Sequence, residues 1–249
     1  MNNERKVAVV TGSYKGLGLE IAKQLGKFDN IQVIITSRDE EKGLESQQKL
    51  EHEGLKFDYH QLDVIDDKSV AEFTKWLQNK YARVDILVNN AGVNPNTQSE
   101  ESSVLTAKLD TVISTFSANL VGALRMCQAL IPLMKEANYG RIVNVSTEMA
   151  CLNYIKDDYY PISPSYRLSK IALNGLACLL AKELKDTNIL INNYSPGWMK
   201  TDIGGASAPF TPEEGAETAV YLATLPDDGS QGGFFAETRK FGGPFALPW

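Results

Sequence analysis

Short apolar runs alternate with longer segments that carry apolar residues at helical spacing, along the whole sequence. The runs are rich in valine and isoleucine, as in parallel strands that are buried on both faces. This alternation predicts an α/β fold, in which a single doubly wound parallel sheet has helices on both faces. The predicted strands are residues 6–11, 32–36, 56–62, 84–88, 141–145 and 189–194, with a short one at 232–236.

The same pattern predicts helices between these strands and one domain over residues 1–249, because no linker or repeat interrupts it. Ser163 and Pro164 are typical of the N-cap and first position of a helix. The acidic residues from Asp39 onward suit the first turn of another helix. The predicted helices are residues 39–53, 66–81, 105–134, 164–185 and 211–225.

A glycine-rich turn follows the first predicted strand. Residues 11–18 read Thr-Gly-Ser-Tyr-Lys-Gly-Leu-Gly, and a helical pattern continues from Leu17. Glycines let the backbone approach a pyrophosphate closely, and the helix N-terminus offers free N–H groups to it. This context predicts a Rossmann-type, three-layer α/β/α domain that binds a dinucleotide. A plain tight turn would use the same residues, so the turn alone leaves both interpretations open.

The end of the second strand indicates which dinucleotide is bound. An acidic residue there would hydrogen-bond the ribose 2′-hydroxyl and select NAD. Here the strand ends in Thr-Ser-Arg, so Arg38 can pair with a 2′-phosphate, and Lys15 can reach the same group. These cations predict NADP(H) as the cofactor. The alternative for Arg38 is a solvated loop cation.

Tyr166 and Lys170 are the candidate acid–base pair. Their spacing places both side chains on one face of the predicted helix, one turn apart. A nearby ammonium favours the phenolate, so the pair is expected to have a lowered tyrosine pKa and to act near neutral pH. Tyr and Lys at this spacing also occur on many solvated helices.

Composition and charge exclude several classes of function. The net charge of -6 is spread over interspersed acids and bases, so nucleic acid is not an expected partner. No apolar stretch is long enough for a signal peptide or a membrane span. The three cysteines are far apart, which favours free thiols in a reducing compartment and a cytoplasmic location. Neither His52 nor His60 has metal-ligand spacing, so no metal site is predicted.

Further polar residues stand at strand ends and complete a pattern. Residues 89–92 read Asn-Asn-Ala-Gly after the fourth strand, Asn119 lies inside a predicted helix, and Ser146 ends the fifth strand. Together with the glycine turn, the Tyr-x-x-x-Lys pair and Pro196-Gly197, these signals resemble the short-chain dehydrogenase/reductase family. The resemblance covers the whole chain and is strongest to the carbonyl reductase-like branch.

The resemblance implies an NADPH-dependent reductase of ketones and aldehydes, with quinones or terpenoid ketones among the candidate substrates. Tyr166 would be the acid–base, Lys170 would hold the nicotinamide ribose, Ser146 would hydrogen-bond the substrate oxygen, and Asn119 would hold a relay water. Besides Tyr166 and Lys170, the implied cofactor contacts are Gly12, Ser13, Lys15, Gly16, Leu17, Gly18, Ser37, Arg38, Asp63, Val64, Asn90, Ala91, Gly92, Pro196, Gly197, Met199 and Thr201.

The substrate cleft is expected between residues 92–104, 147–165 and 198–211. The segment between Thr201 and Thr211 is short, so an open cleft is expected. The 20 residues from Ser146 to Tyr166 are more than is usual in the family, which bears on the oligomeric state. The resemblance leaves a monomer and a homodimer open, and the expected partner is a small carbonyl compound. An NAD(H)-linked secondary alcohol dehydrogenase and a non-catalytic dinucleotide-binding protein are the alternatives.

Overall fold

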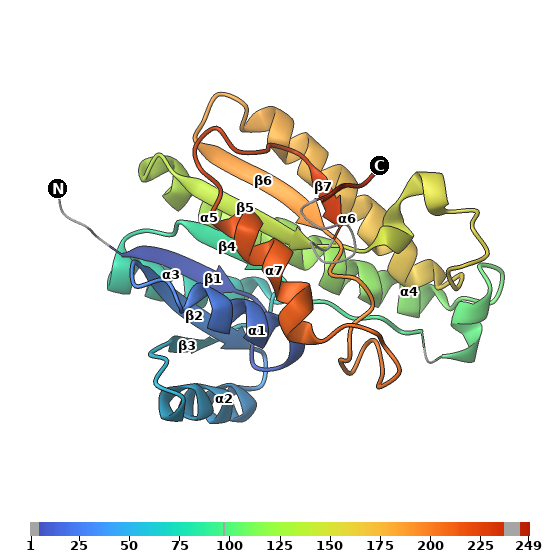
Figure 1. The fold of residues 1–249 in the computed structure, drawn as a ribbon, viewed down its shortest axis with the longest axis horizontal. Coiled ribbons are helices and arrows are strands. Elements are labelled where there is room, and N and C mark those ends of the chain that lie inside the picture. The colour runs from blue at the N-terminus through green and yellow to red at the C-terminus, as the bar shows by residue number, and fades with distance from the viewer. Residues whose placement is uncertain (1–4, 97, 237–244) are drawn as a thin grey trace.

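The structure is a computed structural model, which describes residues 5–96, 98–236 and 245–249. Its strands form one sheet in the order β3-β2-β1-β4-β5-β6-β7-β8 (Figure 1). The pairs from β3 through β7 are parallel, and β8 runs antiparallel to β7. The order reverses between β1 and β4, so the predicted doubly wound sheet is confirmed. The strands are β1 (Lys6–Val10), β2 (Ile31–Ser37), β3 (Asp58–Gln61), β4 (Ile86–Asn89), β5 (Gly140–Val145), β6 (Ile189–Tyr194), β7 (Phe234–Ala236) and β8 (Phe245–Ala246).

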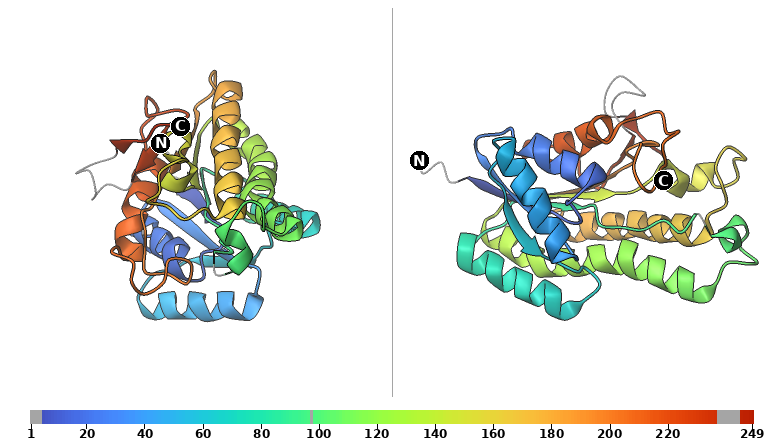
Figure 2. Two further views of the ribbon diagram at one scale, coloured as in Figure 1. Left: turned by 90° about the vertical axis from the view of Figure 1, so that its right-hand side faces the viewer. Right: turned by 90° about the horizontal axis from the view of Figure 1, so that it is seen from below.

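Helices cover both faces of the sheet, which gives the three layers seen in Figure 2. On one face lie α1 (Gly16–Leu25), α2 (Glu40–His52) and α7 (Pro212–Ala223). On the other lie α3 (Asp67–Tyr81), α5 (Gly122–Glu136) and α6 (Pro164–Glu183), with α4 (Leu109–Phe116) beside α6. Shorter helical turns are η1 (Ser99–Ser102), η2 (Ser117–Val121), η3 (Glu148–Ala150) and η4 (Leu152–Tyr154).

Two apolar clusters, one on each face, hold the layers together. Ile21 and Leu222 join α1 and α7 to the sheet through residues such as Val33. Phe73 and Leu130 join α3 and α5 to the opposite face. The central strands β1, β2 and β4 are therefore buried on both sides, which is why their sequences are mostly apolar rather than alternating, whereas the edge strand β3 is polar and only partly buried.

The predicted long helix over residues 105–134 is interrupted. Helix begins at Leu109, passes through the π-helical turn η2 and continues as α5, with Pro132 inside it. A π-helical turn accommodates one extra residue and is frequent at functional sites. The combined segment Leu109–Glu136 is long and apolar enough to cross a membrane by length and composition alone, with 39% of the qualifying window buried inside the fold. A single helix that meets these two criteria is weak evidence for a membrane span.

Candidate active site

The glycine-rich turn packs directly against the segment that follows β4. Gly12 has a φ of 62°, and a Cβ there would lie 3.1 Å from the Cα of Ala91. A Cβ at Gly18 would lie 2.4 Å from Nδ2 of Asn90. That amide donates to the carbonyls of Thr11 (2.9 Å) and Gly12 (3.0 Å). The two glycines are therefore required by this close approach, and Asn90 ties the ends of β1 and β4 together.

Two serines predicted to contact the cofactor form hydrogen bonds inside the fold. The Ser13 hydroxyl donates to the Val10 carbonyl (2.7 Å) and accepts from the N–H of Thr36 (2.9 Å). The Ser37 hydroxyl donates to the carbonyl of Asp39. Both serines are at most 1% exposed. The Ser13 side chain connects β1 to β2, whereas that of Ser37 connects the end of β2 to the start of α2 and to Tyr59 of β3.

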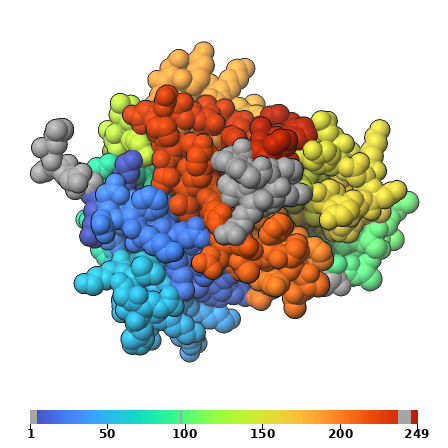
Figure 3. Space-filling view, in the orientation of Figure 1, coloured from blue at the N-terminus to red at the C-terminus, as the bar shows by residue number. Residues whose placement is uncertain are grey.

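The glycine turn also meets the segment after β6. Lys15 forms an ion pair with Asp202, which raises the pKa of the lysine and lowers that of the carboxyl. A Cβ at Gly16 would lie 3.7 Å from Cγ2 of Thr201. Figure 3 shows the two segments, blue and orange, side by side on the surface. Lys15 is thus engaged by a carboxylate that sequence reasoning did not consider.

The end of β2 presents the second predicted cation. Arg38 is exposed, and its carbonyl accepts from Nε2 of Gln61 (2.9 Å). Asp63 is half-buried, and its carboxylate accepts from the N–H of Ile65 (3.1 Å), while Val64 is buried. Among the residues that the structure describes, no side chain pairs with the guanidinium of Arg38, and this exposed cation suits the predicted contact with a 2′-phosphate.

The segments expected at the far half of the cofactor are closely packed. A Cβ at Gly92 would lie 2.9 Å from Oδ1 of Asn119. Gly197 has a φ of 76°, which favours glycine, in the turn that follows Pro196. Met199 is buried and forms an isolated bridge with Phe210. These contacts fix the backbone at the carboxyl ends of β4 and β6.

Asn119 lies in the π-helical turn, is 1% exposed, and uses its amide to hold the chain after Gly92. Its Nδ2 donates to the Val93 carbonyl (2.9 Å) and to Oγ of Ser169 (2.9 Å), and its Oδ1 accepts from the N–H of Val93 (2.8 Å). Both amide N–H groups are used, so one lone pair of Oδ1 remains for a water. The side chain fits a positioning role better than the predicted relay role.

Tyr166 and Lys170 lie in the first turns of α6, as predicted, with Nζ of Lys170 at 5.9 Å from the tyrosine ring centroid. Lys170 is 4% exposed, and its Nζ donates to the Val145 carbonyl at 2.6 Å. Burial lowers the pKa of Lys170 to about 8, because an ammonium loses hydration inside the fold.

The predicted lowering of the tyrosine pKa is wrong for this structure. Burial raises the pKa of Tyr166 to about 12, and a hydrogen bond with the Thr147 side chain opposes that shift only partly. Desolvation of the phenolate outweighs a lysine ammonium that is directed toward Val145. With a pKa of about 12 the phenol retains its proton near neutral pH and has a proton to donate.

The side chain of Ser146 is buried and bonded inside the core. It is 1% exposed and its hydroxyl donates to Oδ1 of Asn174 at 2.7 Å. The same Oδ1 accepts from Asn193, whose own Oδ1 accepts from Asn144 (both 2.8 Å). This chain of buried amides crosses β5 and β6 and reaches α6, and Ser146 is its last donor. The serine predicted to bind the substrate is instead part of the core.

Thr147 provides the hydroxyl beside Tyr166, and sequence reasoning missed it. Its Oγ1 accepts from the N–H of Met149 (3.3 Å), so the hydroxyl proton is left for the hydrogen bond with Tyr166 or for a ligand that replaces it. Successive residues at a strand end point to opposite sides, so only one of the pair Ser146-Thr147 can face Tyr166. Counting that alternation along β5 was the signal that could have distinguished them.

A family model for short chain dehydrogenases matches residues 6–210. The chain belongs to this family. It is 33% identical to carbonyl reductase (NADPH) 1 of Mus musculus, over 96% of this chain and 99% of that protein. The chicken fatty liver structure described as NADPH bound carbonyl reductase has a TM-score of 0.85 at 25% identity, over 99% of both chains. Menthone neomenthol reductase from Mentha piperita has a TM-score of 0.75 at 29% identity, over 93% of this chain and 98% of that chain.

As a short-chain dehydrogenase the chain is an oxidoreductase related to carbonyl reductases and terpenoid ketone reductases. The family uses NAD(P)(H), and the residues present fit a dinucleotide. The N-terminus of α1 has no side-chain cap, so its backbone N–H groups can receive a pyrophosphate. Arg38 and Lys15 stand at the end expected to receive the adenosine half.

Proposed function

We propose that this short-chain dehydrogenase is an NADPH-dependent reductase that converts ketones and aldehydes to alcohols. The observation that carries the proposal is the grouping of Tyr166, Thr147 and Lys170 at the carboxyl end of β5, where doubly wound sheets bind ligands. The names of the similar mammalian, avian and plant reductases support the same direction of reaction.

The bound cofactor supplies the hydride that reduces the carbonyl carbon. The first turn of α1, the Asn90–Gly92 backbone and Lys170 would hold it. Arg38 would pair with the 2′-phosphate through its planar guanidinium, because no acidic residue ends β2 to receive a ribose hydroxyl. Lys15 would join Arg38 once it leaves Asp202.

Tyr166 donates the proton that the carbonyl oxygen needs as it becomes an alcohol. With a pKa of about 12 the phenol is protonated at neutral pH, which suits reduction rather than oxidation. Thr147 donates a hydrogen bond to the same oxygen as negative charge develops there. Lys170 remains cationic below its pKa of about 8 and stabilises the negative charge that Tyr166 acquires.

The direct test is a panel of ketones, aldehydes and quinones with purified protein, monitored by the loss of cofactor absorbance. Turnover is expected with NADPH, and a lower kcat/KM is expected with NADH. Oxidation of secondary alcohols with NAD, faster than any reduction with NADPH, would instead support an NAD-linked alcohol dehydrogenase. Tight NADPH binding without turnover of any compound would support a dinucleotide-binding protein that lacks catalysis.

A further inference from the structure

The two residues on either side of Tyr166 each hold a different segment of the expected substrate cleft. We propose that Glu101 and Arg167 are positioning residues that fix the two walls of the cleft to the turn of α6 that carries Tyr166. The first wall is the segment around η1, and the second is residues 148–161. The inference rests on the proposed function for the identity of the substrate, whereas the hydrogen bonds of Glu101 and Arg167 do not depend on it.

The first wall is attached through Ser165. Glu101 of η1 is 3% exposed, and its carboxylate accepts from the N–H (3.1 Å) and the hydroxyl (2.6 Å) of Ser165. The predicted cap, Ser163, makes no side-chain cap bond and has a φ of 34°, in the left-handed region. A carboxylate from a distant segment therefore caps α6, where negative charge also favours the helix dipole.

The second wall is attached through Arg167, which is 5% exposed. Its Nε donates to the carbonyl of Met149 (2.9 Å) and its Nη1 to that of Pro161 (3.1 Å). Its Nη2 donates to the carbonyls of Ile155 (3.2 Å) and Tyr154 (3.4 Å). One guanidinium thus connects both ends and the middle of the segment to α6.

The second wall needs such an anchor because it contains little regular structure. Between Glu148 and Pro161 the helical turns η3 and η4 leave carbonyls that no strand or helix satisfies. A guanidinium offers five N–H donors in a fixed plane, whereas a lysine ammonium cannot reach several separated acceptors. The hydrogen bond from Tyr160 to Glu148 (2.7 Å) closes the segment on itself. Arg167 therefore donates to backbone carbonyls that regular secondary structure would otherwise satisfy.

The arrangement sets both walls relative to the proton donor. Ser165 and Arg167 are the covalent neighbours of Tyr166, so each wall keeps its distance from the phenol as long as these bonds persist. A substrate that touches both walls is then oriented toward Tyr166 before reaction. Loss of either anchor should weaken the binding of bulky substrates and leave the cofactor site intact.

The test compares Arg167→Met and Arg167→Lys with the wild type, and Glu101→Ala with Glu101→Gln. Glutamine can keep both bonds to Ser165, because its oxygen accepts the N–H and its nitrogen donates to the hydroxyl. Lys182→Met and Glu183→Ala are matched controls, since both residues are exposed near the other end of α6. For each protein the NADPH affinity, the kcat and KM for a bulky and a small ketone, and amide hydrogen exchange are measured.

We expect Arg167→Met, Arg167→Lys and Glu101→Ala to raise the KM for the bulky ketone about tenfold, the loss typical of a hydrogen bond to a charged group. NADPH affinity should stay within about twofold, and Glu101→Gln should restore the KM, as expected for lost substrate binding alone. The amides of Cys151, Tyr154 and Asp157, which donate within the second wall, should exchange faster in the Arg167 variants.

An unchanged KM for the bulky ketone would overturn the proposal, even if exchange becomes faster. Unchanged exchange in both Arg167 variants would overturn it as well, because the anchor would not hold the wall. If Arg167→Met does not fold, Arg167→Lys supplies both measurements. If the wild type reduces no carbonyl compound, the proposed function fails by itself, and the exchange data still decide whether the anchors hold.

Discussion

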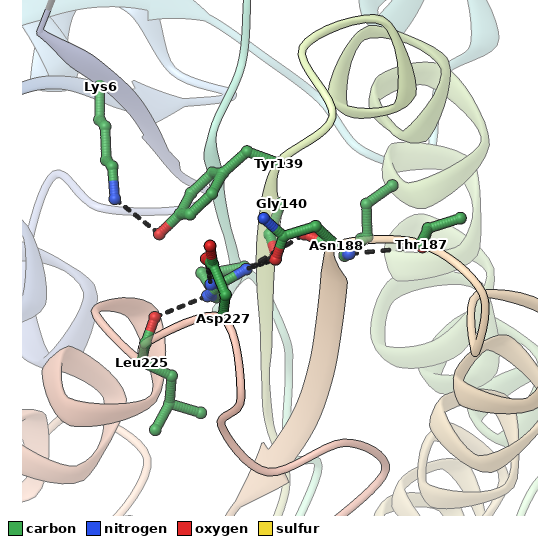
Figure 4. Close-up of polar contacts among 9 residues, drawn as sticks. Lys6, Tyr139, Gly140, Thr187, Asn188, Leu225 and Asp227 are labelled. Carbon is green, nitrogen blue, oxygen red and sulfur yellow. Dashed lines mark hydrogen bonds and ion pairs between the residues drawn. The ribbon is translucent and has the colours of Figure 1, made fainter.

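The two ends of β5 carry polar groups of opposite kinds. At its amino end Arg141 is 1% exposed and donates to the carbonyls of Leu225 (2.8 Å) and Asn188 (3.2 Å) and to the carboxylate of Asp227 (2.7 Å). Tyr139 lies over its guanidinium at 4.2 Å and accepts a 2.8 Å hydrogen bond from Lys6 (Figure 4). The buried guanidinium of Arg141 donates through Nε, Nη1 and Nη2 to protein acceptors, so it has little capacity left for a ligand.

At the carboxyl end of β5 the polar groups keep spare capacity. The hydroxyl of Thr147 has a proton to donate, and Tyr166 is half-buried with its proton retained. Lys170 donates to the Val145 carbonyl and has two further N–H bonds. A strand can thus combine a saturated, stabilising end with an unsaturated, reactive end, and substitutions at the two ends should separate stability from activity.

Arg141→Met should have the largest effect, and on stability. Methionine replaces the aliphatic stem but leaves the carbonyl of Leu225 without the guanidinium donor, whereas the carbonyl of Asn188 keeps the N–H of Gly140. The expected cost is about 3 kcal/mol in the free energy of unfolding. Denaturant unfolding measures the loss, and kcat per folded molecule should be unchanged. A stable variant with lost activity would mean that the two ends of β5 are not independent.

Tyr166→Phe should show the reverse behaviour. The substitution keeps the ring and its packing but removes the proton donor, so kcat should fall at least about 100-fold, the lower range for a positioned acid. The free energy of unfolding and the affinity for NADPH should change little. Steady-state kinetics at saturating NADPH tests this, and a variant that keeps more than about a tenth of the wild-type kcat would require another donor.

The fold and the order of the site residues could be predicted because they depend on local patterns. The apolar runs of β1, β2 and β4, the glycine turn and the spacing of Tyr166 and Lys170 each act over a few residues. The choice between Ser146 and Thr147 depends on which hydroxyl the strand directs toward Tyr166. The pKa of Tyr166 depends on burial by segments far away in the sequence. The direction follows only when the alternation along β5 is counted, and the burial does not follow from the motif at all.

The adjacent hydroxyls of Ser146 and Thr147 permit a matched comparison. Thr147→Val removes the hydroxyl beside Tyr166 with little change in shape, so kcat should fall about tenfold to 100-fold. Ser146→Ala removes a donor from the buried amide chain, so it should lower the free energy of unfolding by about 1 kcal/mol and leave kcat nearly unchanged. A larger loss of kcat in Ser146→Ala than in Thr147→Val would reverse the assignment.

The N-cap of α6 is a second feature that the sequence did not specify. Ser163-Pro164 has the composition of a helix start, and α6 does begin there. The serine was nevertheless not the cap, because Glu101, which is 64 residues before Ser165, occupies that place. Composition located the start of α6. The carboxylate that satisfies its N–H groups, Glu101, comes from a distant segment whose path no local sequence pattern specifies.

The pH dependence should identify Lys170 rather than Tyr166 as the group that limits activity in alkali. Burial lowers the pKa of Lys170 to about 8, so its ammonium is lost as the pH rises through that value. The pKa of Tyr166, raised to about 12, keeps the phenol protonated over the same range. The kcat/KM for NADPH should therefore fall about tenfold per pH unit well above pH 8. In Lys170→Met, NADPH binding should no longer weaken as the pH rises through 8. If the activity of the wild type instead falls near pH 7 while its NADPH affinity stays constant, Tyr166 is the group that limits activity in alkali.

Asp202→Asn should have the smallest effect, and it should increase binding. Asp202 and Lys15 pair on the surface, with side chains 78% and 55% exposed, so the pair is weak and screened by solvent. Removal of the carboxylate frees Lys15 for the 2′-phosphate and removes a negative charge near it, so NADPH should bind about two- to fivefold more tightly, while NADH changes less.

Fluorescence titration of both cofactors at low and high salt measures the difference, which should shrink as salt screens it. Asp228→Asn, an exposed carboxylate after α7, is the control for net charge. An equal gain for NADH and NADPH would show that Lys15 meets the pyrophosphate that the two cofactors share, and the choice of NADPH would then depend on Arg38 alone.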